Sequence, residues 1–222
     1  MENWSKKCKL DKNLKKHNIR YFFYIGGNDS MDTVSKLSTY FKMVDYECYV
    51  IGVPKTIDND LIGTDHTPGY GSACKFISNT IHELKEDTNC YHKGRVTIVE
   101  IMGRDTGWLT ACSKLASLNG NNPDLIYLPE IAFDLETFLE KVDQIFKKQN
   151  KVFVCISEGI RDKNGKLFVG CNDSDVFGHV QLGGAALTLT NIVKERLNLP
   201  VRAIEFNLLQ RCASTIASSV DI

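Results

Sequence analysis

Short apolar runs alternate with longer amphipathic stretches along this chain. This alternation limits the possible fold classes more than any other feature of the sequence. Each run is rich in β-branched and aromatic residues and is long enough only for a strand. In the stretches between the runs, apolar residues recur at helical spacing. Strands that alternate with helices predict parallel βαβ units and an α/β fold. The expected strands are 21–25, 48–53, 96–102, 125–128 and 152–156, and the expected helices are 31–43, 71–84, 106–118, 135–148, 185–197 and 204–218.

The totals describe an ordinary globular chain without a charge bias. Its 222 residues are 43% hydrophobic, which suffices for a sizeable core in one or two domains. The 27 basic and 27 acidic residues cancel, so we expect no nucleic-acid or membrane partner, and any anion site must be local. No window approaches the roughly 20 apolar residues of a membrane span. We therefore expect a soluble, cytoplasmic protein.

Eight cysteines are scattered along the chain without a C-x-x-C pair or a regular spacing. The chain is also far longer than the small domains that disulfides hold together. We therefore expect reduced thiols in a cytosolic protein, most of them serving as small buried apolar residues.

Two glycines follow the first expected strand, where ligands of parallel α/β folds bind. Gly26 and Gly27 let backbone amides approach an anion, and the helix that opens at Asn28, Asp29 and Ser30 favours negative charge. The motif predicts a phosphate cradle. An ordinary turn with a helix N-cap remains the alternative on these residues alone.

The loop 54–60 follows the second expected strand and carries two carboxylates. In an extended loop alternate residues share a face, so Thr56, Asp58 and Asp60 would converge while Ile57 points to the core. In phosphoryl transfer, one aspartate can accept the proton of the attacking hydroxyl while Mg²⁺ offsets charge. Asp58 suits the first role and Asp60 the metal side. A solvated acidic turn is the alternative, and Lys55 beside it argues against that.

Polar residues also follow the third and fifth expected strands. Gly103 and Arg104 place a planar, permanently charged donor where it can grip a sugar or a phosphate. Asp105 could instead cap the next helix, with Arg104 as its surface partner. Glu158 offers an acceptor for a sugar hydroxyl, or belongs to a surface turn. His179, ahead of two further glycines, fits a second anion loop or a structural hydrogen bond.

Five segments together resemble the phosphofructokinase family, in the family's order and from about residue 19 to the C-terminus. The Thr-Ile-Asp-Asn-Asp and Met-Gly-Arg strings are highly specific in combination. The resemblance implies an α/β fold of parallel sheets flanked by helices. The five segments are Gly26–Ser30, Pro54–Asp60, Val99–Arg104, Ser157–Gly159 and Phe177–Gly184.

The resemblance implies phosphoryl transfer to the 1-hydroxyl of fructose 6-phosphate, with Mg²⁺, giving fructose 1,6-bisphosphate in glycolysis. It makes Asp58 the proton acceptor and places Gly26, Gly27 and Ser30 at the donor. Arg95 matches an arginine that reaches a neighbouring subunit's 6-phosphate pocket, which implies a homo-oligomer. The residues that match the substrate site are Thr56, Ile57, Asp58, Arg95, Met102, Gly103, Arg104, Glu158 and His179.

Two positions of the resemblance bear on the phosphoryl donor. ATP-dependent members usually have glycine where this chain has Asp29 and Lys55, whereas diphosphate-dependent members resemble this chain. A carboxylate at Asp29 would repel the α-phosphate of a nucleotide, and an ammonium at Lys55 can offset charge on a leaving phosphate. The expected catalytic set is therefore Asp58, Thr56, Lys55 and Asp29 with diphosphate as donor, and an ATP-dependent 6-phosphofructokinase is the alternative.

The chain also departs from the family pattern. Asn28 stands where an aspartate near the metal is common, so Asn28 and Asp60 form a weaker expected metal pair. Asp173 and Leu182 replace substrate arginines of the shorter bacterial enzymes. We expect a lysine-rich lead over 1–18, a donor-side and catalytic region over 19–130 and a sugar-phosphate region over 131–222. The fold looks incomplete at both ends, so a truncated, non-catalytic or assembly fragment is the alternative of another class.

Overall fold

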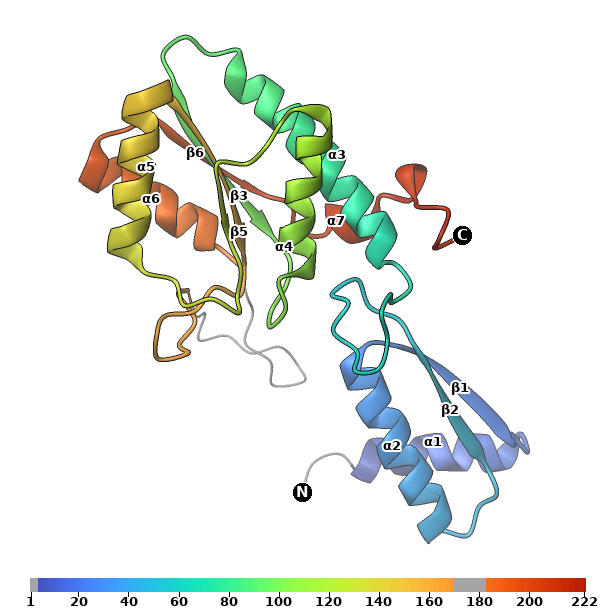
Figure 1. Ribbon diagram of the computed structural model, residues 1–222. Helices are drawn as coiled ribbons and strands as arrows, with labels where there is room; N and C mark the ends of the chain where they lie inside the picture. The colour runs from blue at the N-terminus through green and yellow to red at the C-terminus, as the bar shows by residue number, and fades with distance from the viewer. Residues whose placement is uncertain (1–3, 170–182) are drawn as a thin grey trace. The chain divides into compact units, whose positions relative to one another are not determined.

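A computed structural model describes residues 4–169 and 183–222 (Figure 1). The chain has the predicted α/β architecture and divides into two compact units. The first unit comprises Met1–Thr56 and Leu61–Pro68, and the second comprises Ile57–Asp60 and Gly69–Ile222. Both sides of the expected division at residue 130 lie in the second unit, so that division by role stays a prediction. None of the helices among the described residues is long and apolar enough to cross a membrane.

The first unit is built on a parallel pair of strands, β1 (Tyr21–Gly26) and β2 (Tyr49–Pro54). Helix α2 (Asn28–Met43) connects them and packs on one face of the pair, as expected for a βαβ unit. Its apolar residues recur at helical spacing, which buries Leu37 and Phe41 almost completely. These two side chains form the centre of a small core.

The lysine-rich lead contains an element that the sequence reading missed. Residues Trp4–Lys16 form helix α1, and its Leu14 is buried with the core of the first unit. The Tyr46 hydroxyl donates to the carbonyls of Leu14 and Ile19, at 3.0 and 2.6 Å, and so fixes the end of the helix. The lead therefore contributes to the fold of the first unit.

The second unit contains a four-stranded parallel sheet in the order β4-β5-β3-β6 (Figure 1). Its strands are β3 (Arg95–Ile101), β4 (Leu125–Tyr127), β5 (Lys151–Ser157) and β6 (Val201–Glu205). Strands β3 and β5 are buried along almost their whole length, because helices cover both faces of the sheet.

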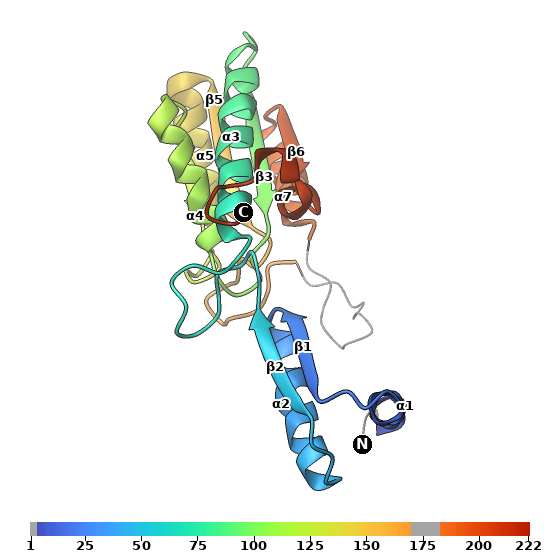
Figure 2. The same ribbon diagram turned by 90° about the vertical axis from the view of Figure 1, so that its right-hand side faces the viewer.

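Helices form a layer on each face of this sheet, as Figures 1 and 2 show. Alternate strand residues point to opposite layers, so Val96 and Ile98 join one core cluster while Val99 and Ile101 join the other. The first cluster includes α5 (Leu135–Gln149) and α6 (Ala185–Leu197), and the second includes α3 (Tyr70–Asn89) and α4 (Trp108–Cys112).

Two expected helices are wrong in part. The predicted helix 106–118 is the short α4 followed by a 3-10 helix, Ser113–Asn119. The predicted helix 204–218 is instead the end of β6, the single turn α7 (Leu209–Cys212) and a short 3-10 segment, Ser214–Ile216. Pairing with β3 extends the chain through residue 205, and a positive φ of 44° at Asn207 interrupts any helix that follows.

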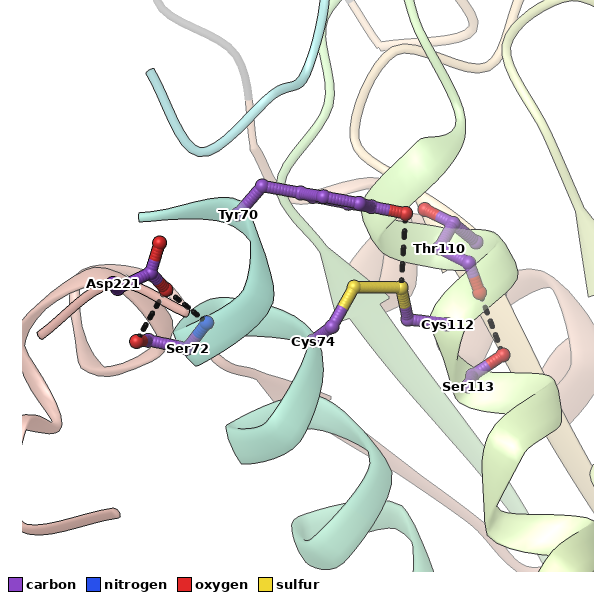
Figure 3. The surroundings of a disulfide bond; sticks show 7 residues. All are labelled: Tyr70, Ser72, Cys74, Thr110, Cys112, Ser113 and Asp221. Carbon is purple, nitrogen blue, oxygen red and sulfur yellow. Dashed lines mark hydrogen bonds between the residues drawn. A yellow bond between two sulfur atoms is a disulfide. The ribbon is translucent and has the colours of Figure 1, made fainter. Parts of the chain in front are cut away.

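The expectation of reduced cysteines is wrong for one pair. Cys74 of α3 and Cys112 of α4 form a disulfide with a Cα–Cα separation of 5.4 Å (Figure 3). This pairing could not be predicted from the sequence, because 38 positions separate the two cysteines and only the packing of α3 against α4 brings them together. The free cysteines that the structure describes are Cys48, Cys90, Cys155 and Cys212.

Candidate active site

The predicted phosphate cradle lies at the carboxyl end of β1 and opens α2. A Cβ added at Gly26 would collide with the side chain of Ser30, so the close approach of this turn requires glycine. Gly27 precedes the helix, and Asn28 and Asp29 are exposed in its first turn. The first turn of this 16-residue helix thus combines backbone amides, which favour an anion, with the carboxylate of Asp29. That carboxylate disfavours a bulky polyanion.

The loop after β2 lies directly beside this cradle within the first unit. The Lys55 amide donates to the Gly26 carbonyl at 2.9 Å, which continues the strand pairing into the loops. A Cβ added at Gly27 would stand 3.6 Å from the Lys55 carbonyl oxygen and 3.7 Å from Cβ of Thr56, within ordinary contact. The Thr56 carbonyl accepts from the buried Thr67 hydroxyl at 2.7 Å. The structure therefore brings the two expected donor segments together.

The catalytic turn Ile57–Asp60 belongs to the second unit. Ile57 is buried in the core cluster beneath α3 and α4, as predicted. The assumption of an extended loop is wrong, because the chain bends at Ile57 and Asp58 and Asn59 has a φ of +54°. The carbonyl of the half-buried Asp58 accepts from the Thr106 hydroxyl at 3.0 Å. The turn is therefore attached to the loop that follows β3.

The predicted sugar-side residues meet at the carboxyl ends of β3 and β5. The Gly103 amide donates to Oε1 of Glu158 at 3.3 Å, and the Ser157 hydroxyl donates to the Gly103 carbonyl at 2.5 Å. Gly103 has a φ of +143°, and an added Cβ would lie 2.5 Å from the Thr106 carbonyl oxygen. Because β3 and β5 are parallel neighbours, the sheet itself brings these distant sequence motifs into contact.

Glu158 has an unusual protonation equilibrium. The pKa of its carboxyl is raised from 4.5 to about 7, mainly by burial and to a smaller extent by the neighbouring carboxylates of Glu100 and Asp58. The Gly103 amide and the charge of Arg104 act in the opposite direction. The influence of Asp58 on this pKa shows that the predicted base and the predicted sugar acceptor share one electrostatic environment.

A pocket lies against these carboxylates in the second unit, and part of its lining was missed by the sequence reading. Gln210, on α7, accepts from the Met102 amide through Oε1 at 3.2 Å and is almost fully buried. The region around it was expected to be helical, so no local pattern pointed to the site. Eight residues line the pocket: Glu100, Ile101, Met102, Glu158, Gly183, Glu205, Asn207 and Gln210.

Glu100 is a second buried carboxylate that the sequence reading did not single out. Its Oε1 accepts from the Gly184 amide at 3.1 Å and its Oε2 from the Ala186 amide at 2.8 Å. Burial is the main reason that its pKa is raised. Glu100 thereby anchors the start of α6 to β3. The predicted histidine, His179, lies outside the described residues.

The alternative interpretation of Asp105 as a helix cap is wrong. Helix α4 begins at Trp108 after Gly107, whose amide donates to Glu130 at 2.6 Å. Asp105 instead pairs with Arg161 at 2.6 Å. Arg104 is exposed on the same loop, beside the pocket carboxylate Glu158 that its charge influences. Arg104 thus remains placed for an anionic or hydroxylated ligand.

Arg95 lies at the amino end of β3, the opposite end of the strand from Gly103. Its guanidinium group stacks over the ring of Tyr91, 4.1 Å from the ring centroid. Within one chain the strand separates Arg95 from the pocket, so a role at a sugar phosphate requires another copy of the chain.

The expected metal residues are oxygen donors in different compact units, Asn28 in the first and Asp60 in the second. Across residues 4–169 and 183–222, no group of three or more His, Cys, Asp or Glu side chains is placed to hold a metal ion. Mg²⁺ commonly binds through one or two carboxylates together with substrate phosphates and water, and a single carboxylate such as that of Asp60 fits that mode.

Similarity to known proteins agrees with this geometry. The family model described as Phosphofructokinase matches residues 2–219, which includes α1 and so extends the resemblance upstream of residue 19. Several relatives carry the name pyrophosphate–fructose 6-phosphate 1-phosphotransferase. The one from Halomonas elongata is 39% identical and the one from Xanthomonas campestris pv. campestris 43% identical, each over 94% of this chain and 51% of the relative.

A solved structure shares the fold. The pyrophosphate-dependent phosphofructokinase from Marinobacter aquaeolei is 36% identical, with a TM-score of 0.80, and covers all of this chain and 53% of its own. The present chain thus spans about half the length of the relatives it matches. The family match over nearly the whole chain, together with motifs that meet at the strand ends, shows that the chain belongs to the phosphofructokinase family.

Proposed function

We propose that this chain carries the catalytic core for phosphoryl transfer from diphosphate to the 1-hydroxyl of fructose 6-phosphate. The products are fructose 1,6-bisphosphate and phosphate. The observation that carries the proposal is the attachment of Asp58 to the loop after β3, in the same electrostatic environment as Glu158. The names of the relatives support the reaction class.

The acceptor sugar binds in the second unit, beside Gly103, Arg104 and Glu158. Glu158 hydrogen-bonds a sugar hydroxyl, and Arg104 supplies a permanent positive charge. Asp58 accepts the proton of the 1-hydroxyl, whose oxygen attacks the nearer phosphorus of the diphosphate as the bond to the leaving phosphate breaks. A base of this kind needs a fixed backbone, which the hydrogen bond to the Asp58 carbonyl supplies.

The donor binds at the first unit. Amides of Gly26, Gly27 and the first turn of α2 face an anion, and the exposed ammonium of Lys55 offsets charge on the leaving phosphate. Asp29, exposed in the same turn, disfavours the additional phosphate of a nucleotide. The choice of diphosphate over ATP therefore rests on Asp29 and Lys55.

Mg²⁺ is the proposed cofactor. Asp60 of the second unit is the proposed carboxylate ligand, together with diphosphate oxygens and water, and the Asn28 amide oxygen of the first unit is the weaker candidate. When bound, it offsets negative charge on the transferring phosphoryl group. Further parts of the proposal are a cytoplasmic, glycolytic role and a homo-oligomer in which Arg95 reaches the 6-phosphate of a neighbouring copy.

The donor assignment is tested by steady-state rates with diphosphate or ATP at equal Mg²⁺. We expect diphosphate to be used, and the double variant Asp29→Gly, Lys55→Gly to lose at least about tenfold in kcat/KM for diphosphate, because charge stabilisation is lost. The control is Asp32→Ala, Lys36→Ala, which removes an exposed ion pair on the same helix and should leave the rates unchanged. Use of ATP with no response to diphosphate would establish the alternative 6-phosphofructokinase. A folded wild type inactive with both donors would favour a non-catalytic assembly fragment.

A further inference from the structure

We propose that Thr106 is a positioning residue that holds the proton acceptor Asp58 on the sugar-binding unit. Its effect on catalysis rests on the proposed function, whereas its effect on the turn Ile57–Asp60 does not. Thr106 lies outside the five segments that mark the family resemblance. Its place in the structure alone singles it out.

The hydroxyl of Thr106 donates to the Asp58 carbonyl at 3.0 Å, across 48 positions of sequence. Thr106 is half-buried, so this bond is partly shielded from water. A hydrogen bond to the backbone fixes the position from which the Asp58 side chain projects and does not involve the Asp58 carboxylate. Thr106 therefore positions Asp58 through its backbone and takes no part in the proton transfer proposed for the Asp58 carboxylate.

The surroundings of Thr106 are themselves fixed. Its carbonyl lies against Gly103, where an added Cβ would approach to 2.5 Å, and Gly103 is held by the Ser157 hydroxyl. The next residue, Gly107, donates its amide to Glu130 at 2.6 Å. Because Gly103 and Gly107 are held in place on either side of Thr106, the Thr106 hydroxyl can fix the position of the turn that it contacts.

The flank of the turn is anchored in the same unit. Ile57 is buried, and its Cγ2 would lie 3.3 Å from a Cβ added at Gly69. The Ser72 amide donates to the carboxylate of Asp221 at 2.6 Å (Figure 3). The Gly69 amide donates to the same carboxylate at 2.7 Å, so Asp221 caps α3. Apolar packing thus fixes one end of the turn, and Thr106 supplies a directional contact at Asp58.

This arrangement makes Thr106 a link between the base and the sugar loop. Gly103 contacts Glu158 on one side and Thr106 on the other, so a displacement of the sugar loop reaches Asp58 through a single side chain. A shift of about 1 Å in a reacting group can cost about 100-fold in rate. The hydroxyl should therefore affect turnover more than the binding of either substrate.

The test compares Thr106→Val, which keeps the shape and removes the donor, with Thr106→Ser, which keeps the donor. Hydrogen–deuterium exchange should rise roughly two- to tenfold for residues 57–60 in the valine variant, because one hydrogen bond is lost. Exchange in β3 and β5 should not change. With diphosphate and fructose 6-phosphate, kcat should fall about tenfold or more while both KM values change less than about threefold. The serine variant should resemble the wild type in both measurements.

Unchanged exchange at 57–60 in the valine variant would overturn the inference, whatever the activity. Equal loss of protection in β3 and β5 would also overturn it, since the effect would then be general unfolding. A wild-type protein that transfers no phosphoryl group would contradict the proposed function only, because the exchange measurement still tests the contact between Thr106 and Asp58.

Discussion

Single residues at the carboxyl ends of β3 and β5 concentrate negative charge in a buried place. Glu100 and Glu158 both have raised pKa values, with burial as the main cause, and Asp58 adds to the effect on Glu158. A carboxyl with a pKa of about 7 is partly protonated near neutral pH, so it can donate as well as accept a hydrogen bond to a sugar hydroxyl. Sugar binding and protein stability should therefore share a dependence on pH.

The sign of the stability effect follows from the direction of the shift. The folded protein binds the Glu158 proton more tightly than the unfolded chain, so the contribution of this group is present below pH 4.5 and is lost as pH rises through 7. We expect the free energy of unfolding of Glu158→Gln, relative to that of the wild type, to be higher at pH 8 than at pH 4.5 by on the order of 2 kcal/mol. Urea unfolding at both pH values measures this difference.

A matched control for that measurement is Asp143→Asn, at an exposed ion pair with Lys147 on α5. It should show little change between the two pH values, because exposed pairs contribute little to stability. A Glu158→Gln variant whose difference from the wild type is the same at pH 4.5 and pH 8 would contradict the raised pKa.

How far the site could be predicted depends on whether a residue carries a local signal. Gly26 could be placed beside Lys55, and Gly103 beside Glu158, because neighbouring parallel strands bring their carboxyl ends to the same edge of each sheet. Thr106 could not, since a threonine hydroxyl becomes a positioning group only through a contact 48 residues away. Glu100, Glu205 and Gln210 were missed for the same reason. The roles assigned to the predicted residues stay predictions.

At the scale of elements, the helices α3 and α4 are joined by more than packing. The disulfide Cys74–Cys112 connects them (Figure 3). Both cysteines belong to the same core cluster as Ile57 of the catalytic turn. The Tyr70 hydroxyl lies 3.4 Å from the Cys112 sulfur. The bond closes a long segment of chain that includes β3 and the sugar loop, so it should restrict the unfolded state considerably.

We expect reduction of this disulfide to lower the free energy of unfolding by roughly 4 kcal/mol, from the loop-closure entropy of a 38-residue separation. Urea unfolding of the wild type with and without dithiothreitol measures the effect. The double variant Cys74→Ser, Cys112→Ser is the control and should not respond to the reductant. Identical unfolding curves for the oxidised and reduced wild type would show that the bond does not contribute.

Most elements followed from periodicity, and the exceptions have physical reasons. Helices α5 and α6 match their predicted ranges closely, because apolar residues recur at helical spacing and the helix ends are marked in the sequence. Asp134 caps the start of α5, and Asn198 caps the end of α6. Strand β6 was not predicted, and its last two residues were taken as the start of a helix, since its five residues are defined by pairing with β3 and not by a local pattern. Helix α1 was missed because lysines dominate its sequence and obscure the few apolar positions that pack.

At the scale of the whole molecule, the two units differ in how well they are covered. The second has helices on both faces of its sheet. The two-stranded sheet of the first unit has one face on which three pairs of apolar side chains, one from β1 and one from β2 in each pair, are exposed. A two-stranded parallel sheet rarely stands with a bare apolar face. The chain spans about half of its relatives' length, so its activity is the decisive question at this scale. The paired residues are Tyr21 with Tyr49, Phe23 with Ile51, and Ile25 with Val53.

The most direct test of the central claim is a ³¹P NMR time course of the protein with diphosphate, fructose 6-phosphate and Mg²⁺. The account predicts that the diphosphate signal is replaced by a new sugar phosphomonoester and phosphate. It also predicts that Asp58→Asn slows this exchange by about 100-fold or more, because the proton acceptor is lost. Equal time courses for the wild type and Asp58→Asn, or no transfer by the folded wild type, would contradict it.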